Sequence, residues 1–292
     1  MKFSKYDACG SDFIVVEFFS NGDRGNLAKA LCNRSEGIGG NGLIAIVTQD
    51  RSSNTLGGSN SSENATFYIE YYHANGTRTP ITINATMAAC MYAYEKFLAG
   101  KTVIFKNEGE TITGEISGFD VGRSVWIGQK KRDFSFGKIF GMGSNRAITA
   151  NVEVEIQNVN RMGEGFVSGG NMWYMYETGM PNLVTFVNSL SSYNNALAQE
   201  LAEKFNANVS FAQIDGNNLK VRTYSYGAKK EVLSCGSGVA CAYVAGRARM
   251  GLGEDVNTTC VTGEKMGVRM QAEDLAYVKA DVRHLFDGEY MA

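Results

Sequence analysis

Two distant stretches of this chain follow the same order of local patterns, and this repeat constrains the fold more than any other feature. Tyr71 lies 11 residues before Thr82, and Tyr224 lies 11 residues before Cys235. Both stretches run from a strand pattern through a glycine-containing turn and a short second strand to a helix. Internal similarity of this kind indicates duplicated units. We therefore expect an α+β architecture of two similar domains.

Local patterns place the first helix and the strands before it. The apolar run GLIAIV (42–47) and the alternating TFYIEYY (66–72) predict strands, and the polar segment 49–66 predicts a long loop. From Ala85 to Leu98 the apolar residues recur with the period of a helix, with Asn84 or Thr86 as the expected cap.

The second helix should run from about Ser237 to Arg249 and end near Gly251 or Gly253. Its small residues allow strands to enclose it closely. Cys90 and Cys241 fall inside the two predicted helices, where we expect them to be packing residues.

Composition excludes several classes of function. The chain has 292 residues, 44% hydrophobic and 20% charged, with a formal net charge of −2, which is typical of a soluble globular protein. This balance gives no reason to expect nucleic acid or an acidic membrane as partner. No apolar run of membrane-spanning length and no export leader is seen, so we expect a cytoplasmic protein. The chain has six cysteines but no C-x-x-C pair, and it has only two histidines. These counts argue against a zinc site.

Cys235 precedes Gly-Ser-Gly at the start of the second predicted helix. Backbone N–H groups at a helix start have no partner within the helix and lie at the positive end of its dipole. We therefore expect the Cys235 thiol to be more acidic than an ordinary cysteine, beside a site for a ligand carboxylate. Such a pair fits proton abstraction next to a carboxylate. A buried, inert cysteine fits the local string equally well.

The ordered motifs of the chain resemble those of the diaminopimelate epimerase family of amino-acid racemases. They are MKFSKYDACGSDFIVV, LCNRSEGIGGNGLIAIV, ETGMPNLVTF, FNANVSF and VRTYSYG…LSCGSG. The resemblance implies two pseudo-symmetric domains, each with strands wrapped around a central helix, and a site between them. It also implies no cofactor, no pyridoxal phosphate, and two cysteines on opposite faces of the substrate α-carbon.

The resemblance also implies domain boundaries and an assembly. We expect a first domain of residues 1–124 plus 278–292 and a second of 125–277, with YVKADVRHLFDGEY crossing back to the first. Members often dimerise, which makes a homodimer an open expectation. The implied role is in amino-acid metabolism, with lysine biosynthesis as the family's pathway.

One catalytic position departs from the family pattern. Cys235 matches one cysteine, but Thr82 stands where the other is expected, followed by Ile83 in place of a glycine and by the retained Asn84. A threonine hydroxyl is far less acidic than a thiol and cannot rest as an anionic base. Three hypotheses stay open: a racemase using Cys235 and Thr82 with water or His73, an α,β-eliminating lyase, and a binding protein that has lost catalysis.

Positions that match the family's substrate contacts have also changed. The family's glutamate–arginine pair corresponds to Ser225 and Tyr226, which removes a bidentate carboxylate clamp. We expect an amino-acid substrate that keeps its α-carboxylate but has a less charged or more aromatic far end. NATM (84–87) and SCGSG (234–238) are also similar to strings of histidine racemases. The carried-over substrate-binding positions are Ser11, Gly42, His73, Ile83, Asn84, Met180, Asn182, Asn208, Ser225, Tyr226, Gly236 and Ser237.

The two histidines and the tyrosines of one predicted strand have different expected roles. His73 titrates near neutral pH in its unperturbed form and could be the missing acid or base, or a polar residue at a strand end. His284 is expected to be structural or exposed. The tyrosines of FYIEYY are expected to pack in the core or at the domain interface.

Overall fold

The structure is a computed structural model that describes residues 1–48, 64–121, 148–157, 159–261, 263–272 and 275–291. The predicted loop over 49–66 lies mostly outside these residues, and Asn64 already belongs to a strand. Within the described residues no helix is long and apolar enough to cross a membrane.

The first half of the chain alternates strands with two helices. In order, its elements are β1 (Lys2–Ala8), β2 (Ser11–Phe18), α1 (Gly25–Cys32), β3 (Gly42–Val47), β4 (Asn64–His73), β5 (Arg78–Thr79), α2 (Ile83–Glu95), β6 (Thr102–Asn107), β7 (Glu110–Val121) and β8 (Ile148–Gln157).

The second half contains the same kinds of element. They are β9 (Asn160–Arg161), β10 (Phe166–Ser168), β11 (Asn171–Glu177), β12 (Pro181–Phe186), the 3₁₀ turn η1 (Leu190–Ser192), α4 (Asn195–Phe205), β13 (Asn208–Asp215), β14 (Asn218–Ser225), β15 (Lys230–Val232), α5 (Gly236–Met250), β16 (Asp255–Thr259), β17 (Lys265–Ala272) and β18 (Leu275–Glu289).

Strand pairing confirms the duplication predicted from the sequence. β2 pairs in parallel with β3 across α1, and β12 pairs in parallel with β13 across α4. β4 pairs with β5 and, in parallel, with β6, whereas β14 pairs with β15 and, in parallel, with β16. The hairpins β6–β7 and β16–β17 then repeat the same step. The chain therefore builds one supersecondary unit twice.

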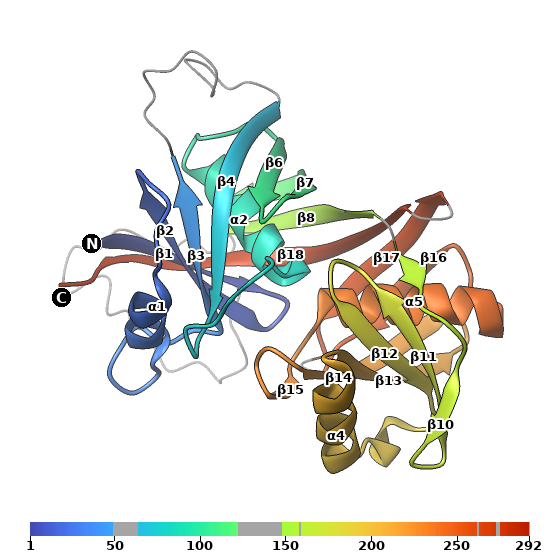
Figure 1. Ribbon diagram of the computed structural model, residues 1–292. Coiled ribbons are helices and arrows are strands. Elements are labelled where there is room, and N and C mark those ends of the chain that lie inside the picture. Colours follow the sequence, from blue (N-terminus) through green and yellow to red (C-terminus); the bar gives the residue numbers. More distant parts are fainter. Residues whose placement is uncertain (49–63, 122–147, 158, 262, 273–274, 292) are drawn as a thin grey trace, which may run out of the picture.

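Each unit wraps its strands around one helix. α2 packs against β1, β2, β3, β6, β7, β8 and β18, and α5 packs against β11, β12, β13, β14, β17 and β18 (Figure 1). Both helices are buried on nearly every side, which requires apolar or small side chains all round. The small residues Ala240, Ala242 and Ala245 are fully buried in α5 and allow the strands to approach it.

Two long strands join the units. β18 pairs with β17 at its start and with β1 at its end, so it extends from the α5 unit to the α2 unit (Figure 1). β8 pairs with both β18 and β7. The return of the last segment to the first unit is confirmed by the pairing of β18 with β1. We propose that the units are the two domains expected from the sequence; the expected boundary at 124–125 lies outside the described residues.

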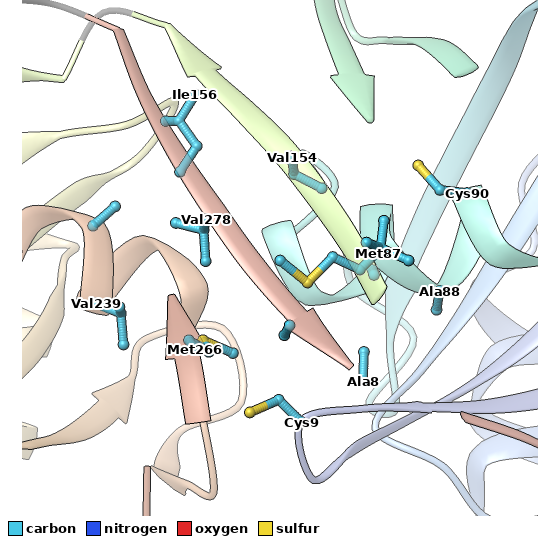
Figure 2. Packing of buried hydrophobic residues seen from close by; sticks show 14 of the residues in the cluster. Ala8, Cys9, Met87, Ala88, Cys90, Val154, Ile156, Val239, Met266 and Val278 are labelled. Atoms are coloured by element: carbon cyan, nitrogen blue, oxygen red, sulfur yellow. The ribbon is translucent and has the colours of Figure 1, made fainter. Parts of the chain in front are cut away.

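The main hydrophobic core continues through the junction of the two units. Figure 2 shows Met87 of α2, Val154 of β8, Val278 of β18 and Val239 of α5 within one cluster. These side chains are at most 1% exposed. Packing between the units thus fixes how the starts of α2 and α5 face each other.

Most local predictions are confirmed, with two omissions. The strands at 42–47 and 66–72 are β3 and part of β4, and α5 ends at Gly251 in the left-handed conformation that glycine favours. Cys90 and Cys241 are buried packing residues of α2 and α5. Helices α1 and α4 were not predicted from the sequence.

Cys90 sets a steric limit in strand β7. A Cβ on Gly114 would overlap the Cys90 sulfur, whereas a Cβ on Gly118 in the same strand would lie at an ordinary 3.6 Å from Asn151 Cβ. We predict that Gly114→Ala lowers the free energy of unfolding by about 1–3 kcal/mol, since overpacking forces neighbours to move. Gly118→Ala, the matched control, should change it by about 0.5 kcal/mol or less.

Urea denaturation measures both effects. Because the clash involves one sulfur, the cost of Gly114→Ala should shrink when it is combined with Cys90→Ala. An unchanged cost in that background would contradict the assigned contact.

Candidate functional site

The starts of α2 and α5 converge on one cavity of about 230 Å³. Thr82 is the N-cap of α2, and its hydroxyl accepts a hydrogen bond from the Ala85 N–H at 3.3 Å. Cys235 is the N-cap of α5, and its sulfur accepts one from the Gly238 N–H at 3.4 Å. The expected caps Asn84 and Thr86 are wrong, because both lie inside the helix. Thr82 and Cys235 therefore occupy equivalent positions and face the same cavity.

The side chain of Asn84 joins the two helix starts. Its Oδ1 accepts a hydrogen bond from the Gly236 N–H at 2.9 Å. Its Nδ2 donates to the Ser234 hydroxyl at 2.9 Å and to the Ala8 carbonyl at 3.1 Å. The Ser234 hydroxyl also lies 3.4 Å from that of Ser11. Asn84 is only 4% exposed, so these contacts satisfy a buried amide completely enough to hold it in one orientation.

The cavity brings together most of the residues expected from the sequence. Those that line it are Ser11, His73, Thr82, Ile83, Asn84, Ser225, Cys235, Gly236 and Ser237. They come from both units, as expected for a site between them. A cavity of about 230 Å³ is smaller than a typical drug-sized pocket, which suits a ligand the size of an amino acid.

Four other expected residues form a layer behind Ser237. The Asn208 Nδ2 lies 3.3 Å from Asn182 Oδ1, 3.4 Å from the Ser237 hydroxyl and 3.2 Å from the Met180 sulfur. The Asn208 Oδ1 accepts a hydrogen bond from the Tyr226 N–H at 3.0 Å. Asn182 and Asn208 are at most 3% exposed. These residues hold Ser237 in place and do not line the cavity.

Gly42, the remaining expected position, lies against the Tyr71 ring. A Cβ there would come within 2.6 Å of Tyr71 Cε2 and 2.8 Å of its hydroxyl. Only glycine leaves room for Tyr71 at this place, so Gly42 acts through that ring.

Burial dominates the acidity of Cys235. The surrounding protein atoms desolvate the thiol and raise its pKa, although the Ser237 hydroxyl at 3.3 Å and the N–H groups of Ser237 and Gly238 lower it in part. The expectation of an unusually acidic thiol is therefore wrong. The helix start stabilises the thiolate, but it does not offset the loss of water around the sulfur.

His73 is neutral in this environment. Burial of the imidazole lowers its pKa to about 4. The Tyr71 hydroxyl lies 3.3 Å from His73 Nδ1, and the two rings meet edge to face at 5.1 Å. His73 therefore lines the cavity as a neutral imidazole, with the Tyr71 phenol beside it. His284 lies elsewhere and pairs with Glu95 at 2.9 Å, in a structural role.

Several polar residues of the cavity were not predicted. They are Asn41, Tyr71, Asn75, Lys230 and Ser234. Tyr71 was expected in the core or at the domain interface; it is 2% exposed and also lines the cavity. The signal that could have identified it is the two-residue spacing to His73, since alternate residues of a strand share a face.

No cluster of metal-binding side chains is present among the described residues; three or more His, Cys, Asp or Glu nowhere come together in an arrangement that could hold a metal ion. The chemistry available in the cavity comes from a thiol, an imidazole, a phenol, an ammonium group, hydroxyl and amide groups and helix-start N–H groups.

Comparison with solved structures places the fold. A predicted epimerase from Pseudomonas aeruginosa superposes with a TM-score of 0.67 at 14% identity, covering 100% of this chain and 99% of that one. A hydroxyproline epimerase from Agrobacterium vitis, with bound trans-4-hydroxy-L-proline, gives a TM-score of 0.58 at 10% identity over 100% and 91% of the two chains. These similarities show a shared fold.

Comparison of sequences identifies the family, although no family model matches the chain. A diaminopimelate epimerase from Campylobacter jejuni subsp. doylei is 32% identical over 292 residues, covering 99% of both chains. One from Nitratiruptor is 29% identical over 98% of this chain and 97% of the other. With the shared fold and the convergent helix starts, this similarity shows that the chain belongs to the diaminopimelate epimerase family and is an isomerase of the racemase and epimerase type.

Proposed function

We propose that this protein moves the α-proton of an amino acid without a cofactor, with Cys235 on one face of the α-carbon and Thr82 on the other. The observation that carries the proposal is the equivalence of these residues. Each caps the central helix of its unit, and both line one cavity. Two acid–base groups on opposite sides of a carbon are what inversion requires.

The α-carboxylate is proposed to lie at the two helix starts. The first N–H groups of α2 and α5 have no partner inside their helices, and the two dipoles place partial positive charge there. The Gly236 N–H is already bonded to Asn84, and the Ser237 N–H interacts with the Cys235 sulfur, which leaves the groups at Ile83 and Asn84 for the ligand. The same groups would stabilise the enolate-like charge that develops as the proton leaves.

The far end of the substrate would lie toward Ser225, Asn75 and Lys230. Tyr226 contributes its backbone N–H to Asn208, and the pair expected to hold a charged amino-acid end in the family is absent at Ser225 and Tyr226. We therefore propose a substrate with a neutral or heteroaromatic side chain, of which histidine is the leading example. Diaminopimelate, named for the relatives, and with it a role in lysine biosynthesis, is the alternative.

Cys235 would act as thiol in the free protein and as thiolate in catalysis. Burial keeps the free thiol protonated, and a substrate ammonium group beside it would favour ionisation. Thr82 cannot form a resting anion, so its hydroxyl would transfer a proton that another group supplies or accepts. His73, neutral and in the same cavity, is available for this.

We also propose a cytoplasmic homodimer. All six cysteines are free in the structure, which suits a reducing compartment. The homodimer follows family precedent, and sedimentation of the purified chain tests it.

The reaction itself is tested in heavy water. We predict that incubation with single L- and D-amino acids, histidine and diaminopimelate included, gives deuterium at the α-carbon with inversion, followed by NMR and chiral chromatography. Loss of ammonia or water from the substrate would instead support a lyase. Tight binding without any exchange would support a binding protein and contradict the proposed reaction.

Substitutions at the two caps test the assignment of roles. Cys235→Ala should lower α-proton exchange by about 10²–10⁴-fold, the usual contribution of a general acid or base. Cys241→Ala, which removes a buried thiol from the same helix, is the matched control and should leave exchange unchanged. Thr82→Cys should raise racemisation, because it places a second thiol at the equivalent cap. No effect from either Cys235→Ala or Thr82→Cys would contradict the assignment.

The pH dependence follows from the pKa of Cys235. Because burial raises that pKa, the reactive thiolate is scarce at neutral pH and increases as pH rises. We predict that kcat/KM for the exchanging amino acid rises with pH beyond the ordinary cysteine value of about 8.5. NMR of α-proton exchange in samples quenched at set times measures kcat/KM at each pH. A value that is constant from pH 6 to 9 would contradict the role of the free thiol.

A further inference from the structure

We propose that Tyr71 carries protons between Thr82 and His73, so that the face of the cavity opposite Cys235 uses an imidazole through a phenol in place of a second thiol. The inference rests on the proposed function. It adds the residue that would let the Thr82 side of the cavity transfer a proton without a second thiol. It also gives a reason for a tyrosine at a buried position that lines the cavity.

Tyr71 interacts with both of the other two groups. Tyr71 and His73 are alternate residues of β4 and share its face, and the Tyr71 hydroxyl is 3.3 Å from His73 Nδ1. On its other side the phenol interacts with the Thr82 hydroxyl, which lowers the pKa of Tyr71, as a hydrogen-bond donor to the phenolate does. All three line the cavity. The order is therefore Thr82, Tyr71, His73.

Glycines fix the two rings in this arrangement. Gly42 packs against the Tyr71 ring and hydroxyl, and Phe13 contacts the same ring edge to face at 6.2 Å. A Cβ on Gly227, from the turn after β14, would overlap His73 Nε2. The phenol and imidazole are thus held between the two units, and a transferred proton would not require them to move.

The protonation states at rest suit the transfer. Burial outweighs the effect of Thr82 and raises the pKa of Tyr71, so the phenol holds its proton. Burial lowers the pKa of His73 to about 4, so the imidazole is neutral at rest, and its Nδ1 accepts the phenol proton in the tautomer that carries its hydrogen on Nε2.

The proposed step balances in protons and charge. The α-proton passes to the Thr82 oxygen as the Thr82 hydroxyl proton passes to the Tyr71 oxygen and the phenol proton passes to His73 Nδ1. The products are an imidazolium and the carbanion, whose negative charge the helix-start N–H groups stabilise. The reverse sequence delivers a proton to the carbanion that Cys235 has generated on the other face.

The test compares the two enantiomers of one exchanging amino acid, with histidine as the first probe. Initial deuterium uptake by L-histidine and by D-histidine is measured separately for the parent, Tyr71→Phe and His73→Asn. Both variants should lower uptake about 10²–10⁴-fold for one enantiomer only, the one whose α-proton faces Thr82. The other enantiomer should still exchange through Cys235 at the parent rate.

A rescue separates this role from a structural one. Adding Thr82→Cys to Tyr71→Phe should restore uptake by the affected enantiomer, because a thiol needs no phenol to ionise. Tyr72→Phe is the matched control: its hydroxyl bonds Gly22 and it belongs to the neighbouring position of β4, so neither enantiomer should be affected.

The outcomes distinguish this inference from the proposed function. If neither histidine nor diaminopimelate exchanges with the parent protein, the proposed function itself fails, and this inference fails with it. If the parent exchanges but Tyr71→Phe leaves both enantiomers unchanged, or lowers both without rescue by Thr82→Cys, only the role of Tyr71 is overturned.

Discussion

One buried amide, that of Asn84, holds the site together. It belongs to α2, yet its carbonyl accepts the first N–H of α5, and its amino group bonds Ala8 and Ser234. Removal of this side chain would leave the Gly236 N–H buried without its partner, at a cost of about 1–3 kcal/mol. Because the contact joins the starts of both central helices, the positions of Thr82 and Cys235 relative to each other depend on it.

The duplication places Thr82 and Cys235 at equivalent N-cap positions, although their side chains differ in chemistry. Both residues have to accept the N–H three residues on, and threonine is a favoured cap whereas cysteine is not. Thr82 therefore serves the helix better than a thiol would, at the loss of an acidic group. The neighbouring pair of Tyr71 and His73 has no counterpart at the equivalent Tyr224 and Tyr226, and it lies beside the threonine.

The sequence predicted the parts of the fold that rest on local periodicity. The strands before each central helix, the ends of α5 and the repeat itself could be recognised because alternation and helical spacing are local signals. α1 and α4 lie outside the repeated spans Tyr71–Thr82 and Tyr224–Cys235, so the repeat carries no signal for them. The cap at Thr82 was missed because the apolar pattern starts three residues later, at Ala85.

Within the site, the sequence identified residues better than environments. Ser11, His73, Asn84 and Cys235 all line the cavity, whereas Asn208 and Met180 lie behind it. No local sequence pattern distinguishes a residue that lines a cavity from one that lies behind it. The acidity expected for Cys235 considered the helix dipole without the desolvation that only packing reveals. Tyr71 was assigned a packing role, in the core or at the domain interface, for the related reason that a buried ring and a ring lining a cavity share one alternating pattern.

Burial holds two groups of the resting site, Cys235 and His73, in their neutral forms. Cys235 retains its proton because its pKa is raised, and His73 stays uncharged because its pKa is lowered. A neutral buried thiol is a poor target for oxidants, since the thiolate is the reactive form. The charges that would activate the site are then those of the amino acid itself, whose ammonium group favours a thiolate and whose carboxylate favours an imidazolium. Binding of the substrate and ionisation of the catalytic groups would thus be one event, which would limit the reactive thiolate to the time when a substrate is present.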